Sequence, residues 1–180
     1  MVFEEVKLDL PITSGPYAPT WKSIEANYPG TPEWLRDSKF GIWIHFGPQS
    51  AGESGDWYAR NLYKQGHLAN NNHLKGFGHP SEVGFKDIIP LFKAEKWNPD
   101  KLVEFYKKIG AQYFFALGNH HDNFDLWDSK YQAWNSKNMG PKRDILAEWE
   151  QAARKYELPF GISFHADHAW TWYEPSQRYD

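Results

Sequence analysis

Histidines follow the ends of three apolar runs in this chain of 180 residues. His45 closes the first run, His120 and His121 follow the second, and His165 closes the third. If these runs are neighbouring parallel strands, their carboxyl ends share one edge of a sheet, where α/β enzymes place their active sites. The four imidazoles are therefore predicted to meet in one polar pocket, although each could instead be a separate hydrogen-bonded core residue.

Imidazoles can bind a metal ion or hydrogen-bond to a polar substrate. Neutral imidazole suits Zn²⁺ or Fe²⁺, but the sequence has neither an H-x-H pair on the first apolar run nor an H-E-x-x-H helix motif. His120 and His121 are adjacent, so on an extended chain they would point opposite ways. His165 and His168 have a chelating spacing, but they lie where the strand is ending. Hydrogen bonds to sugar hydroxyls suit imidazole better, so we predict no metal and no cofactor.

Aromatic residues supply a second sign of a carbohydrate site. They make up 18% of the chain, and Trp57 lies between Asp56 and Tyr58 in the segment after the first apolar run. An indole offers a flat face to the C–H groups of a sugar, while a neighbouring carboxylate accepts hydrogen bonds from its hydroxyls. The alternative is that Trp57 anchors a long loop to the core.

Hydrolysis of a glycosidic bond needs two carboxyl groups, about 5 Å apart when configuration is retained. Spacing in the sequence identifies no such pair. Asp122 is expected to orient His121 or to cap a turn. The candidate carboxylates near the histidines are Asp122, Asp125, Asp128 and Asp167.

Several classes of function lack support in the sequence. It contains no G-x-G-x-x-G, G-x-x-x-x-G-K-[ST] or G-x-S-x-G motif, and its lack of cysteine excludes disulfides and thiolate chemistry. The 20 basic and 23 acidic residues give a net charge of -3, so we expect no nucleic-acid or membrane partner. No apolar run approaches the roughly 18 residues of a membrane span, and residues 1–10 lack the apolar stretch of a signal peptide.

The pattern of apolar residues predicts an α/β fold. Runs typical of strands buried on both faces cover residues 40–46, 113–117 and 160–164. Helix starts are predicted at Thr31, Asn98 and Asp144, each followed by helix-forming or periodic apolar residues. Strands that alternate with helices indicate βαβ units and a parallel sheet.

The same pattern divides the chain into regions. Residues 1–31 contain four prolines and no sustained period, so they are predicted to form an extended N-terminal arm. Residues 47–90 are rich in glycine, with an Asn run at 70–72, and are predicted to form long loops. Three strands cannot close an eightfold barrel, which takes about 250 residues. Residues 32–180 are therefore expected to be a partial (β/α)8 catalytic domain that continues beyond the chain end.

Four segments, in order, resemble the α-L-fucosidases of glycoside hydrolase family 29. Residues 34–47 (WLRDSKFGIWIHFG) are similar to the family's first-strand signature, and residues 92–99 (FKAEKWNP) to the segment leading into its first barrel helix. Residues 120–127 (HHDNFDLW) resemble its second-strand motif, and residues 140–144 (GPKRD) also fit. The match covers most of the chain.

This resemblance implies the N-terminal portion, about three βα units, of a (β/α)8 TIM-type barrel. It also implies retaining exo-hydrolysis of terminal α-L-fucose on oligosaccharides, polysaccharides or glycoconjugates, in a secreted or periplasmic protein. No catalytic carboxylate is expected within this chain, because the nucleophile and the acid/base would lie beyond Asp180, so the 180-residue fragment alone should be inactive. The predicted substrate-binding residues are His45, Asp56, Trp57, His120, His121, Phe164 and His165.

The sequence also departs from the family's pattern. Asp56 stands where the family usually has Glu, Asn123 replaces the usual Gly, and His165 follows a strand where a Tyr commonly lies near the sugar. Together with Asp167 and His168, His165 indicates altered polar recognition, as of a substituted fucose. Two alternatives stay open: a metal-dependent hydrolase that uses the strand-end histidines, and a non-catalytic fucose-binding module.

Overall fold

The computed structural model describes residues 14–165. The chain divides into two compact units, Met1–Asp37 and Ser38–Asp180. All the residues predicted to do chemistry that the structure describes belong to the second unit, while Asp167 and His168 lie outside the described residues. Among the described helices, none is long and apolar enough to span a membrane.

The first unit contains more helix than its prolines suggested. Helix α1 (Trp21–Asn27) begins after Thr20, whose hydroxyl accepts a hydrogen bond from the Ser23 amide. The prediction of an extended arm is therefore wrong for this segment, because a helix of seven residues is too short to show a clear period. The predicted helix after Thr31 is confirmed as α2 (Glu33–Ser38).

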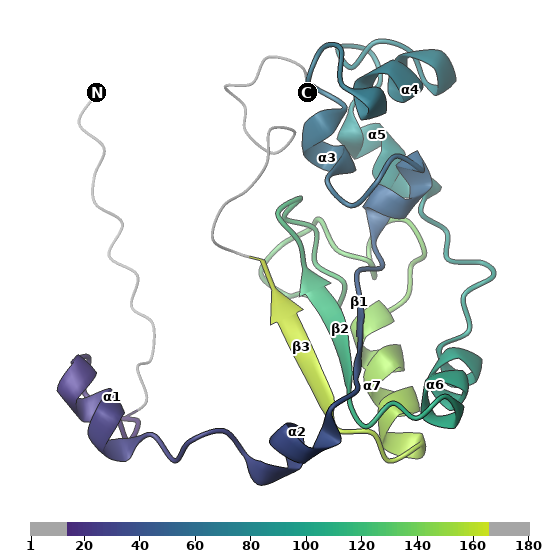
Figure 1. The fold of residues 1–180 in the computed structure, drawn as a ribbon. Coiled ribbons are helices and arrows are strands. Elements are labelled where there is room, and N and C mark those ends of the chain that lie inside the picture. The colour runs from purple at the N-terminus through teal and green to yellow at the C-terminus, as the bar shows by residue number, and fades with distance from the viewer. Residues whose placement is uncertain (1–13, 166–180) are drawn as a thin grey trace. The chain divides into compact units, whose positions relative to one another are not determined.

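A three-stranded parallel sheet forms the centre of the second unit (Figure 1). Its strands β1 (Ile42–Ile44), β2 (Phe114–Asn119) and β3 (Phe160–Phe164) lie in chain order. Helix α6 (Pro99–Lys108) precedes β2, and α7 (Ile145–Lys155) precedes β3. The predicted α/β fold with a parallel sheet is therefore confirmed.

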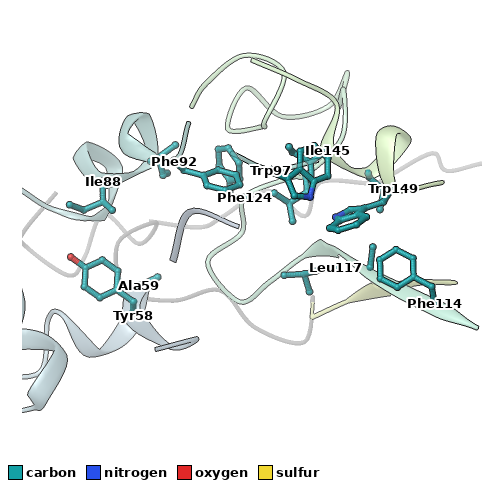
Figure 2. Close-up of a cluster of buried hydrophobic side chains, with 14 of the residues drawn as sticks. Tyr58, Ala59, Ile88, Phe92, Trp97, Phe114, Leu117, Phe124, Ile145 and Trp149 are labelled. Carbon is teal, nitrogen blue, oxygen red and sulfur yellow. The ribbon is translucent and has the colours of Figure 1, made fainter. Parts of the chain in front are cut away.

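Both long helices begin where the sequence indicates. The side chain of Asn98 accepts from the Lys101 amide at 3.0 Å, and that of Asp144 accepts from the Ala147 amide at 2.8 Å. Their apolar faces pack on one face of the sheet, where the ring of Phe114 lies 5.0 Å from that of Trp149. Figure 2 shows this part of the core, with Phe114 and Leu117 of β2 beside Trp149 and Trp97.

The opposite face of the sheet is not buried, contrary to the prediction for these strands. Trp43 in β1 is 58% exposed, and its partner in β2, Phe115, is only partly buried. Helices α6 and α7 cover one face only, and no described segment covers the other. An apolar run predicts that both faces of a strand are covered, but it does not show which chain segment covers each face.

The segment between β1 and α6 is helical rather than loop-like. It contains η1 (Pro48–Gly52), α3 (Tyr58–Asn61), α4 (Leu68–Gly76), α5 (Phe85–Ile88) and η2 (Ile89–Leu91), and α4 includes the Asn run that the sequence assigned to a loop. Tyr58, Leu62, Phe85 and Ile88 are fully buried and give these short helices a common core. Tertiary packing therefore stabilises elements of one or two turns that periodicity cannot detect.

Candidate functional site

The three strands bring four imidazoles together. His45 follows β1, His120 and His121 follow β2, and His165 follows β3. The ring centroid of His165 lies 4.9 Å from that of His45, 4.8 Å from that of His120 and 5.1 Å from that of His121. The predicted meeting of these side chains in one place is confirmed. We call these four residues the imidazole cluster.

The adjacent histidines do not point apart, as an extended chain would require. The rings of His120 and His121 lie 4.9 Å apart, and both contact His165. The reason is that β2 ends at Asn119 and the chain turns, with the Asn123 amide donating to the His120 carbonyl oxygen at 2.9 Å. Asn123 adopts φ 55°, a left-handed conformation that Asn and Gly tolerate best.

A one-residue shift in the ladder sets His165 beside His120. Leu117 pairs with Ser163, but Asn119 pairs with Phe164, so one residue of β2 is left over at Gly118. The His165 amide then donates to the Asn119 carbonyl oxygen at 2.9 Å. A Cβ at Gly118 would lie 2.8 Å from Phe164, so only glycine fits at this position without a shift.

Asp56 is the carboxylate of the cluster. Its Oδ2 lies 3.0 Å from His45 Nδ1 and 3.3 Å from His120 Nε2, while Gln49 Nε2 donates to its Oδ1 at 3.4 Å. Burial disfavours the charged form of Asp56, but the hydrogen bonds and charges of His120 and His45 outweigh it and hold its pKa well below the usual range. Because an ionised carboxylate only accepts, the two facing ring nitrogens carry protons.

The second ring nitrogen of His45, Nε2, is available to a ligand. His45 Nε2 is buried and has no hydrogen-bond partner among the described residues. Since Nδ1 holds the proton toward Asp56, Nε2 of the neutral ring is an acceptor. A hydroxyl group that reaches this nitrogen would find a preorganised acceptor.

The charge state of His165 depends on its neighbours. Burial lowers the pKa of His165, and the positive charge that His120, His45 and His121 can carry lowers it further, against an opposing effect of Asp56. His165 therefore favours the neutral form, in which one ring nitrogen donates and the other accepts. This is the form that binds hydroxyl groups.

Asp122 lies behind the cluster and is almost completely buried. Its Oδ1 accepts from the Phe124 amide at 3.1 Å, so its predicted role as a turn cap is confirmed. Burial raises the pKa of Asp122 to about 6, although the Phe124 amide and His120 favour the charged form. The other candidates lie elsewhere: Asp125 accepts from the Asn119 side chain at 2.7 Å, and Asp128 is exposed on the following loop.

Aromatic rings border the cluster. Trp57 is 48% exposed and its ring lies 6.5 Å from that of His121, so it is not a core anchor for its loop. Trp43 lies 4.8 Å from His45 and 5.9 Å from His165, and its indole N–H donates to Ser163 Oγ at 3.0 Å. Sequence reasoning missed Trp43, although its spacing of two from His45 on a strand puts both on one face.

Two other residues complete the comparison with the sequence. The ring of Phe164, predicted to bind substrate, packs at 5.6 Å on that of Trp127, and its edge lies over Gly118. Strand alternation explains this placement, because neighbours in sequence face opposite sides of a sheet. Gln49, which the sequence did not indicate, lies in η1 and contacts Asp56.

Two sets of side chains in the described part of the chain are compact enough to hold a metal ion. They are His120, His121 and His165, and His45, Asp56 and His120, with donor atoms within 4.8 Å of one another in each set. Imidazole and carboxylate donors suit Zn²⁺. In the second set, however, the donors already meet at hydrogen-bond distances of 3.0 and 3.3 Å.

Comparison with known proteins decides the family. A family model described as alpha-L-fucosidase matches residues 6–179. This chain belongs to the alpha-L-fucosidase family. The resemblance of its four sequence segments to that family is therefore confirmed.

Relatives within the alpha-L-fucosidase family cover nearly all of this chain. It is 32% identical over 167 residues to a plasma alpha-L-fucosidase of Homo sapiens and 34% identical over 165 residues to an alpha-L-fucosidase of Branchiostoma floridae, with 88% of this chain covered in each case. The matches cover 33% and 35% of those relatives, so the chain spans about a third of their length.

A solved alpha-fucosidase is similar in fold to this chain. The crystal structure of the Thermotoga maritima alpha-fucosidase in complex with a mechanism-based inhibitor matches with a TM-score of 0.76 at 32% sequence identity. The match covers 86% of this chain and 38% of the Thermotoga chain.

Proposed function

We propose that the protein to which this chain belongs is a retaining exo-α-L-fucosidase, and that this chain supplies part of its sugar-binding pocket. The observation that carries the proposal is the imidazole cluster around Asp56, built from three separate strand ends. Family membership supports the reaction class. Carboxyl ends of parallel strands are the place where barrel enzymes bind substrate.

The fold part of the proposal is a partial barrel. The three parallel strands in chain order and the helices α6 and α7 on one face are what the first βα units of a (β/α)8 barrel contain. The exposed face with Trp43 and Phe115 would then be the barrel interior. Further strands of the same protein would cover this face.

Each side chain of the cluster has a defined part in sugar binding. His45 and His120 donate to Asp56, His45 offers its second nitrogen to a hydroxyl group, and His121 and His165 extend the row of polar groups. Trp57 presents a half-exposed indole that can pack on the C–H and methyl face of fucose. The ligand class is therefore a fucosylated carbohydrate.

Asp56 does not fit the role of a catalytic acid. Its carboxylate stays ionised because His120 and His45 hold its pKa low, and a general acid must carry a proton at the working pH. Asp56 instead acts as an acceptor that orients two imidazoles. We propose that the nucleophile and the acid/base come from the protein beyond Asp180, about 5 Å apart as retention requires.

His165, which follows β3, gives the pocket an additional polar group. It contacts three other imidazoles and Trp43, so it borders the same space as His45. An imidazole here can bond to a further oxygen of the ligand, and we propose that the preferred substrate is a substituted fucoside, such as a sulfated one. A preference for unmodified fucoside would contradict this part of the proposal.

The gene product tests the function directly. We expect it to release fucose from 4-methylumbelliferyl α-L-fucoside and not galactose from the β-D-galactoside. Stoichiometric Zn²⁺ in elemental analysis, with activity abolished by a chelator, would instead favour a metal-dependent hydrolase at the three-histidine set. Fucose binding in calorimetry without hydrolysis would indicate a binding module.

A further inference from the structure

A buried tyrosine–histidine pair lies immediately behind Asp56 and Trp57. Tyr58 follows them in sequence and begins α3, and its side chain is fully buried. The Tyr58 hydroxyl lies 2.5 Å from Nδ1 of His73 in α4. His73 Nε2 in turn lies 2.7 Å from the carbonyl oxygen of Val83, just before α5. Two hydrogen bonds therefore join three parts of the helical segment.

The direction of both hydrogen bonds follows from the acceptor at one end. A carbonyl oxygen only accepts, so His73 Nε2 carries a proton, and Nδ1 of the neutral ring accepts from the Tyr58 hydroxyl. Burial raises the pKa of Tyr58, so its hydroxyl keeps the proton that it donates. The pair therefore has one fixed arrangement rather than several exchangeable ones.

The ring of Tyr58 is also held from its other side. A Cβ at Gly52 would lie 2.2 Å from the Tyr58 ring, which shows that the ring packs directly on the backbone of η1. Near the same loop, the side chain of Asn72 in α4 donates to Ser54 Oγ at 3.2 Å. The loop that carries Asp56 and Trp57 is thus tied to η1 and α4, and Tyr58 forms its end.

The geometry at Asp56 allows little displacement of this loop. Its Oδ2 contacts His45 Nδ1 at 3.0 Å and His120 Nε2 at 3.3 Å, and a hydrogen bond weakens beyond about 3.5 Å. Tyr58 is two residues from Asp56, so a shift of its ring against η1 and α4 would be expected to displace the carboxylate as well. A displacement of about 0.3 Å away from His120 is enough to take the 3.3 Å contact beyond that limit.

We propose that Tyr58 and His73 are positioning residues, which hold Asp56 and Trp57 in place against the imidazole cluster. Neither is proposed to touch the sugar. They act by fixing the carboxylate that orients His45 and His120 and the indole that borders the pocket. The kinetic effect of this arrangement rests on the proposed fucosidase function, whereas its structural effect on the histidines does not.

The test compares two Tyr→Phe substitutions in the same helical segment of the gene product. Tyr58→Phe removes the hydroxyl that donates to His73, and Tyr63→Phe removes one that accepts from the Phe85 amide at 2.9 Å. We expect Tyr58→Phe to raise KM for an aryl α-L-fucoside roughly tenfold with a smaller change in kcat, because misplaced binding groups weaken substrate positioning. Tyr63→Phe should leave KM within about twofold of the wild-type value, even if it lowers the melting temperature as much as Tyr58→Phe does.

Histidine side-chain NMR gives a readout without substrate. The ring nitrogen signals of His45 and His120 should shift in Tyr58→Phe and stay in place in Tyr63→Phe, because only the first loosens Asp56. If Tyr58→Phe does not fold, His73→Gln takes its place with the same expectations. Equal effects of both Tyr variants, or unchanged histidine signals with Tyr58→Phe, would overturn the proposal. A wild type that turns over no fucoside would refute the function, and the NMR comparison would still decide the positioning role.

Discussion

Asp56→Asn tests whether the carboxylate organises the pocket. The substitution keeps the size of the side chain but replaces an ionised acceptor by an amide. Two charge-assisted hydrogen bonds are affected, at 3.0 Å to His45 and 3.3 Å to His120. Such bonds contribute about 1.5–3 kcal/mol each, and the partial exposure of Asp56 favours the lower end. The sum of about 3 kcal/mol corresponds to a loss of roughly 100-fold in kcat/KM.

Steady-state kinetics of the gene product on an aryl α-L-fucoside measures this loss. Asp56→Glu, which keeps the charge, should retain more activity than Asp56→Asn. Asp128→Asn is the matched control, because Asp128 is an exposed aspartate on the loop after β2, and it should stay within about twofold of wild type. An Asp56→Asn enzyme within about threefold of wild type would refute the view that Asp56 orients the imidazoles.

Three further predictions concern stability and specificity. Burial raises the pKa of Asp122 from 3.8 to about 6, so its contribution to stability is greatest below pH 4 and is lost as the pH rises to 6. In urea unfolding, the free energy of unfolding of Asp122→Asn should therefore rise by about 3 kcal/mol relative to that of wild type between pH 4 and pH 6. A constant difference between the two proteins would argue against the raised pKa. Asn98→Ala removes the cap that accepts from Lys101 and should lower the free energy of unfolding by about 1 kcal/mol, whereas no change would mean that the cap is dispensable. His165→Tyr should reduce any preference for sulfated over plain fucoside in competition assays; an unaltered ratio would exclude His165 from substrate selection.

The framework of the second unit could be predicted because its signals are local and strong. Asn98 and Asp144 are side chains that cap helices, and both do so here. The apolar runs before His120 and at 160–164 form the strands expected of them. Since carboxyl ends of parallel strands meet at one edge, the position of the imidazole cluster followed from the order of the elements alone.

The features that sequence reasoning missed depend on contacts between distant residues. Helices α3, α4 and α5 are short, and the buried core around Tyr58 and Phe85 stabilises them more than their own periodicity does. The contact of Gln49 with Asp56 crosses a turn of irregular backbone, so no spacing rule reveals it. The rotation that brings His120 and His121 to the same side also arises after the strand has ended.

The unpaired residue Gly118 lies between the regular part of the β2–β3 ladder and the residues that carry the imidazole cluster. Before Gly118, β2 and β3 pair in one register, from Phe114 with Phe160 to Leu117 with Ser163. After Gly118, the register shifts by one residue, and His165 lies beside His120. Deleting that single glycine would leave the lower ladder and its packing on α7 intact, while Asn119 and the residues after it would turn to the opposite face of the sheet. One insertion or deletion at this position can therefore change which side chains after β2 face the imidazole cluster without altering the packing below it.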